Sequence, residues 1–167
     1  MDKLRFDFTF DHLEYSRDFI DVNKLSLWIF HIDKIPPHIG LSQQGVFFSL
    51  KSNGRDEVPT KKLIQIIENK YIKCILLNLK NNSEVDEIRK VFNKYERAFS
   101  STISCLTPIK EVLNISDRAS KLSELLTVLN ERNLLSTYCS YNVTQSELGI
   151  LKYEVSDIDH RLNLLHA

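Results

Sequence analysis

Two apolar runs of strand length constrain the fold of this chain more than any other feature. Leu25 to Ile32 (LSLWIFHI) and Ile72 to Leu79 (IKCILLNL) contain few polar side chains. Apolar runs this short are typical of buried strands, whereas a membrane-spanning helix needs about 20 apolar residues. We therefore expect both runs to be strands of a sheet, and we expect no membrane span.

Alternation of residue types predicts further strands in the first half of the chain. From Leu4 to Phe10, apolar and polar residues alternate with the period of a half-buried strand. His38 to Ser42 and Val46 to Lys51 flank the turn residues Gln43-Gln44-Gly45, and this arrangement predicts a hairpin. Proline has no N–H to donate, so Pro36-Pro37 separates the hairpin from the apolar run before it.

Helical spacing of apolar residues dominates after residue 114. One such segment runs from Ala119 to Leu129, and a second follows a capping box formed by Thr144 and Glu147. We therefore predict an α+β fold. A small antiparallel sheet with helices packed on one side would occupy residues 1–114, and a helical C-terminal section would follow in residues 115–167.

The charge composition argues against several classes of function. Acidic and basic side chains number 22 each, so the formal net charge is zero and no basic stripe for nucleic acid is evident. The first residues, MDKLRFDFTF, lack the apolar core of a signal peptide, and Cys74, Cys105 and Cys139 form no CxxC pair. We expect reduced thiols in a cytoplasmic protein. We expect no metal or other cofactor, because metal-ligand spacings and phosphate-binding glycine motifs are absent.

Cys105 is the candidate nucleophile. It lies in SCLTPIKEVL, where Pro108 suits the first turn of a helix because its missing N–H costs nothing there. Unpaired N–H groups at the start of a helix favour a thiolate and can hold an oxyanion. A buried structural role is the common alternative for a single cysteine, since free cysteine is among the most buried residue types.

His38 is the candidate base for Cys105, and Ser49 is the candidate residue that orients the imidazole. His38 opens a predicted strand and Ser49 lies on the next one, where an inward-facing polar residue would meet the histidine. Asn53, at the end of that strand, is a second candidate for the orienting role. The alternative is that His38, which follows Pro36-Pro37, is a turn residue at a strand edge.

The order of these motifs resembles the circularly permuted papain-like fold. HIGLS on a strand, a hairpin and CLTPI at a helix start follow one another between His38 and Leu113. In the branch related to lecithin–retinol acyltransferases and bacterial cell-wall hydrolases, a His-x-Gly strand precedes the nucleophilic cysteine. The resemblance implies that His38 is the base, Cys105 the nucleophile and a polar residue near Ser49 the third member. It implies a cysteine-dependent hydrolase or acyltransferase that acts on an amide, ester or thioester of an acyl- or peptide-type substrate.

A second hypothesis is a non-catalytic interaction module, which includes an inactive relative of that family. Its basis is a stripe of apolar residues that repeat at steps of three and four, as in a coiled-coil seam. Such a stripe either packs on the sheet of its own domain or forms an interface with a protein partner or a second copy. Its members are Leu148, Leu151, Val155, Ile158, Leu162 and Leu165.

Overall fold

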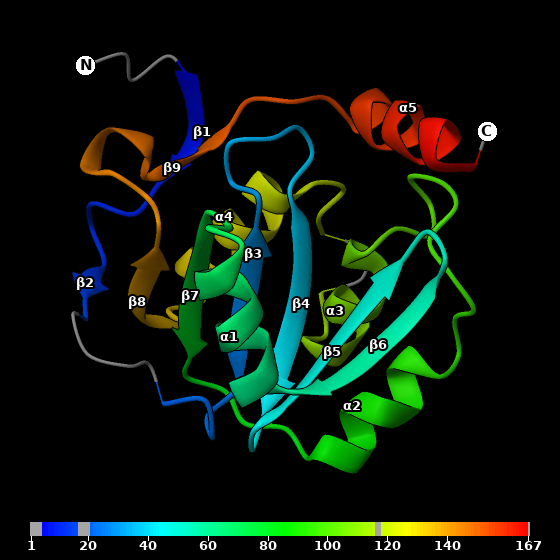
Figure 1. The fold of residues 1–167 in the computed structure, drawn as a ribbon, viewed down its shortest axis with the longest axis horizontal. Helices are drawn as coiled ribbons and strands as arrows, with labels where there is room; N and C mark the ends of the chain where they lie inside the picture. The colour runs from blue at the N-terminus through cyan, green and yellow to red at the C-terminus, as the bar shows by residue number, and fades with distance from the viewer. Residues whose placement is uncertain (1–4, 17–20, 116–117, 167) are drawn as a thin grey trace.

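A seven-stranded sheet forms the centre of the molecule (Figure 1). The computed structural model describes residues 5–16, 21–115 and 118–166. All neighbouring strands of the sheet are antiparallel except β2 and β8, which are parallel. From one edge to the other, the strands are β2 (Glu14–Tyr15), β8 (Leu135–Tyr141), β7 (Cys74–Leu79), β3 (Ser26–Phe30), β4 (His38–Gln43), β5 (Val46–Lys51) and β6 (Gly54–Pro59).

The two apolar runs form β3 and β7, which pair with each other near the middle of the sheet. Every residue of both strands is buried, as the runs predict. The predicted hairpin is also confirmed, as β4 and β5. Its turn residues Gln44 and Gly45 have φ angles of 49° and 77°, the left-handed conformations that a tight hairpin turn with the right twist requires.

Helices cover both faces of the sheet. Helix α1 (Thr60–Asn69) packs its apolar side on the face that carries Trp28 and Leu76. The opposite face is covered by α2 (Val85–Phe92), α3 (Leu106–Val112) and α4 (Leu122–Glu131). The fold is therefore α+β as expected, but the expectation of a small sheet with helices on one side is wrong. Strands that are apolar on both faces need a cover on each.

The section expected to be all-helical, residues 115–167, contains two strands in its described part. β8 pairs with β7 and so belongs to the main sheet, and β9 (Gly149–Leu151) pairs with β1 (Phe6–Thr9) in a separate two-stranded sheet. In the described residues after β9 there is a single helix, α5 (Val155–His166). The prediction of an all-helical section after residue 114 is therefore wrong, because residues on both sides of this position belong to the same sheet.

The capping box of Thr144 and Glu147 is present, but it closes a single 3₁₀ turn (Gln145–Glu147) rather than opening a long helix. The chain then becomes extended at Gly149. A Cβ atom at that glycine would lie 2.4 Å from Cγ of Phe6. The strands β1 and β9 can therefore lie this close together only because Gly149 has no side chain. In the described part of the chain, no helix is long and apolar enough to cross a bilayer.

Candidate functional site

A cavity of about 910 Å³ lies at one end of the sheet, beneath helix α5. Figure 1 places α5 at the end where the β3–β4 connection and the β5–β6 turn lie. Ligand pockets in proteins commonly have volumes of about 300–1,000 Å³ and mostly apolar walls, so this cavity has the size of a small-molecule site. Its walls come from the β3–β4 connection, β4, β5, the segment 98–105 and α5.

The cavity forms where β4 and β5 separate. Their antiparallel pairing covers only Leu41–Gln43 of β4. Towards the cavity, β4 continues to pair with β3 as far as His38, while β5 pairs with β6 as far as Lys51. Phe47 fills part of the space between them, and a Cβ atom at Gly40 would lie 2.3 Å from Cζ of its ring. The glycine of the HIGLS motif therefore makes room for an aromatic wall of the cavity.

Ser49 brings a buried hydroxyl without a partner to this cavity. Its side chain is 0% exposed, and its Oγ has no hydrogen-bond partner among the described residues. Ser42 on β4 differs, because its Oγ accepts a hydrogen bond of 2.8 Å from Nε1 of Trp28. Buried polar groups are nearly always hydrogen-bonded, so the free hydroxyl of Ser49 stands out.

His38 lies on the cavity wall with its ring stacked on Phe30, at a centroid distance of 5.9 Å. Its ring nitrogens form no hydrogen bond with any described residue. Burial lowers the pKa of His38 to about 4. The Asp56 carboxylate acts in the opposite direction, and Lys51 and His31 lower the value further. The imidazole is therefore neutral at physiological pH and offers one donor and one acceptor.

Cys105 immediately precedes α3, so the predicted helix start is confirmed. The residue also lines the same cavity. The side chain is half-buried, and burial raises the pKa of the thiol. Backbone hydrogen bonds at Ile39 and at Cys105 itself act in the opposite direction but are smaller. The resting state of this cysteine is consequently the thiol rather than the thiolate.

The structure gathers the predicted catalytic residues Cys105, His38 and Ser49 around one cavity, with Asn53 at its edge. No hydrogen bond joins any two of the three among the described residues. His38 stacks on Phe30 on the sheet face that α1 covers, whereas Cys105 packs against the core on the other face. Their catalytic roles therefore stay predictions.

The predicted interface stripe is divided between two elements. Leu151 lies in β9, whereas Ile158 and Leu162 are buried on α5 and line the cavity. Leu165 is 48% exposed at the cavity edge. Leu148 and Val155 are half-buried. Packing within the chain thus accounts for Ile158 and Leu162.

Charged residues that sequence reasoning had not selected lie at the mouth of the cavity. Lys34 and Arg161 are exposed there, and neither side chain forms a hydrogen bond or salt bridge within the described part of the chain. Lys51 and Asp56, in contrast, form an ion pair of 3.0 Å. No spacing in the sequence links Lys34 to Arg161, because only the fold brings α5 to the β3–β4 connection.

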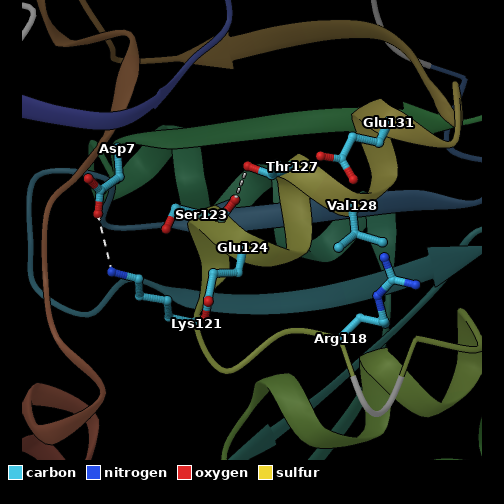
Figure 2. A pocket seen from close by; sticks show the side chains of 8 residues that line it. All are labelled: Asp7, Arg118, Lys121, Ser123, Glu124, Thr127, Val128 and Glu131. Atoms are coloured by element: carbon cyan, nitrogen blue, oxygen red, sulfur yellow. Dashed lines mark hydrogen bonds and ion pairs between the residues drawn. The ribbon is translucent and has the colours of Figure 1, made fainter.

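A second, shallower hollow of about 380 Å³ lies beside α4 (Figure 2). Several of its polar groups already have partners. Lys121 Nζ lies 3.4 Å from an Asp7 carboxylate oxygen and donates a 3.0 Å hydrogen bond to the Tyr153 carbonyl. Thr127 donates its hydroxyl proton to the Ser123 carbonyl at 2.8 Å. These contacts tie α4 to β1 and to the residues before α5, so we assign the hollow a structural role.

Comparison with protein families, with curated proteins and with solved structures found no match to this chain. The resemblance to the permuted papain-like family stays a prediction. The geometry of the cavity is therefore the basis for a functional proposal. Among the described residues, no cluster of histidine, cysteine and acidic side chains could hold a metal ion.

Proposed function

We propose that the protein binds a small, mostly apolar molecule in the cavity beneath α5. The observation that carries the proposal is that Ser49, which lines this cavity, has a buried hydroxyl without a hydrogen-bond partner among the described residues. A buried polar group left unpaired costs about 1–3 kcal/mol. A ligand with one polar group inside the cavity would pair with this hydroxyl and remove that cost.

The other polar groups of the interior fit a neutral polar group on the ligand. The imidazole of His38 is neutral because burial lowers its pKa to about 4, and Cys105 is a thiol because burial raises its pKa. The interior therefore offers hydrogen bonds without a formal charge. Phe30, Phe47 and Leu162 supply apolar walls for the rest of the molecule.

The probe for this proposal is decanol, a flexible apolar chain with one hydroxyl. We expect saturable shifts of backbone amide NMR signals in β4, β5 and α5 when decanol is added to the full chain. Ser49→Ala should weaken binding severalfold. Ser42→Ala is the matched control, because that serine lies on the adjacent strand and outside the cavity lining. Shifts confined to exposed Leu164, or no shifts, would contradict the proposal.

A second candidate function is the cysteine-dependent hydrolase or acyltransferase that the sequence predicts. The observation in its favour is that Cys105, His38 and Ser49 line the same cavity. Neutral His38 would accept the thiol proton while Sγ of Cys105 attacks the substrate carbonyl carbon. The imidazolium would then protonate the leaving group, and a thioester would remain on Sγ. Water or an acceptor, deprotonated by His38, would release the acyl group.

This candidate is tested by incubation with p-nitrophenyl decanoate and mass spectrometry of the intact protein. An acyl adduct on Cys105, absent in Cys105→Ala and in His38→Ala but retained in Cys139→Ala, supports the hydrolase. Cys139 is a suitable control because it is buried on β8, outside the lining of the cavity. Release of p-nitrophenol that is unchanged in Cys105→Ala would rule out this mechanism.

A further inference from the structure

We propose, on the basis of the function proposed above, that the ligand is an amphipathic anion. Its negatively charged head would lie between Lys34 and Arg161 at the mouth of the cavity, its apolar body would extend beneath α5, and the neutral polar group proposed above would lie beside Ser49 at the inner end. The cations and the exposed apolar side chains at the mouth support this assignment.

The mouth carries two cations that form no ion pair with any described residue. Four charged residues line the cavity, and two of them, Lys51 and Asp56, pair with each other at 3.0 Å. The remaining two, Lys34 and Arg161, have no ion pair among the described residues. The whole chain has a formal net charge of zero, so this local excess is a property of the site and not of the composition.

The two cations converge on one place, although they are far apart in the sequence. His31 is half-buried at the mouth, and its pKa is lowered first by burial and then by both Lys34 and Arg161. Asp33, which does not line the cavity, acts in the opposite direction. Both cations therefore lie near His31, and all three residues line the same cavity.

Apolar side chains lie beside these cations. Ile35 is 47% exposed next to Lys34 in the chain, and Leu165 is 48% exposed one helical turn after Arg161. Both line the cavity, whose deeper walls include Leu162 and Phe47. Exposed apolar residues next to unpaired cations form the complement of a molecule that has an anionic head and an apolar body.

The interior explains why the head would stay at the mouth. Ser49, His38 and Cys105 offer no positive charge there, so an anion drawn inside would lose its hydration without gaining a partner of opposite charge. The apolar body has the opposite preference, because its transfer from water into the cavity is favourable. The two preferences together fix the direction in which the ligand lies.

The test compares 10-hydroxydecanoate with decanol by isothermal titration calorimetry on the full chain, near neutral pH and below the concentrations at which either probe aggregates. A carboxylic acid is ionised under these conditions, so the two probes share a chain with a terminal hydroxyl and differ in charge. We expect 10-hydroxydecanoate to bind about tenfold more tightly, a difference that two rim cations can supply. Added salt should reduce this difference.

The variant Lys34→Gln/Arg161→Gln should bind both probes equally. Lys61→Gln/Lys62→Gln, on the exposed side of α1, removes the same charge outside the cavity lining and should keep the tenfold difference. Equal affinity of the wild-type chain for both probes, or a preference that survives Lys34→Gln/Arg161→Gln, would overturn the anionic assignment and leave the cavity a binding site. Failure of both probes to bind would overturn the proposed function itself.

Discussion

Asp159 on α5 accepts two hydrogen bonds from Ser101, one from the backbone N–H at 2.6 Å and one from Oγ at 2.8 Å. At the other end of the helix, Nε2 of His166 lies 3.0 Å from the carbonyl oxygen of Ala98. Both contacts attach α5 to the segment that precedes Cys105. Because Ile158 and Leu162 complete the cavity from above, these polar contacts hold the roof of the proposed site in place.

The first prediction concerns this attachment. Asp159→Ala removes both hydrogen bonds to Ser101, and hydrogen bonds to a charged group contribute about 1.5–3 kcal/mol when buried. Because the pair is only partly buried, we expect a loss of about 1 kcal/mol and faster hydrogen exchange along α5. Asn163→Ala, an exposed position on the same helix, is the control. Equal exchange rates in the two variants would show that apolar packing alone holds α5.

The second prediction uses two buried serines on neighbouring strands. Ser49→Ala removes a hydroxyl that has no partner among the described residues, so the free energy of unfolding without ligand should rise by up to about 1 kcal/mol. Ser42→Ala should lower it by about 1–2 kcal/mol, because the N–H of Trp28 loses its acceptor. Urea denaturation of both variants measures the difference. A decrease of similar size in both would mean that Ser49 is hydrogen-bonded in solution.

The third prediction concerns the pH dependence of stability. The pKa of His38 is lowered to about 4, mainly by burial, from an ordinary value of about 6.5. Between these values the unfolded state binds a proton that the folded state does not. The free energy of unfolding should therefore fall as the pH drops from about 6.5 towards 4, by less than about 3 kcal/mol because the residue is not fully buried.

His38→Gln should flatten this part of the profile. The groups that face His38 are Asp56, Lys51 and His31, and His31, whose pKa burial also lowers, would contribute to a residual slope in the variant. Urea denaturation from pH 8 to 4 provides the measurement, and the comparison at pH 8 isolates the effect of the substitution on packing. A variant with the same slope as the wild type would rule out His38 as its source.

The fourth prediction concerns the thiol of Cys105. Because burial raises its pKa, iodoacetamide should modify the native protein at this position only above the ordinary thiol pKa of about 8.5. Cys74 is fully buried on β7 and should react only after unfolding, which provides an internal control. Mass spectrometry resolves the two sites. Modification of Cys105 below about pH 7, lost in His38→Ala, would instead favour the hydrolase.

The sequence predicted the centre of the fold because a local signal determines it. The apolar runs of β3 and β7 have no alternative to burial, and the Gln44-Gly45 turn specifies a hairpin. The strand β8 had no such signal. Its sequence, LSTYCSY, mixes polar and apolar residues without a regular alternation, and pairing with β7 on one side and β2 on the other makes it a strand.

The candidate site was predictable in part for the same reason. His38, Ser49 and Cys105 could be selected by residue type and by their place at the ends of predicted elements. Lys34 and Arg161 could not, because their relationship depends on where α5 lies. The apolar stripe on α5 was visible in the sequence. Its spacing, however, does not say whether the stripe faces the rest of the chain or a partner, so the burial of Ile158 and Leu162 within the chain could not be predicted.

The last prediction concerns the close approach of β4 and β5. Gly40→Ala would place a Cβ atom 2.3 Å from Cζ of Phe47 and 2.8 Å from the carbonyl oxygen of Phe48. We expect a loss of at least about 1–3 kcal/mol in urea denaturation, because β5 is held by β6 and cannot shift freely. Phe47→Leu removes the clash with the ring but not that with the backbone, so Gly40→Ala/Phe47→Leu should lose less stability than the two single variants combined. Strict additivity would contradict this account, because it would mean that the ring already moves aside and that Gly40 does not shape the cavity wall.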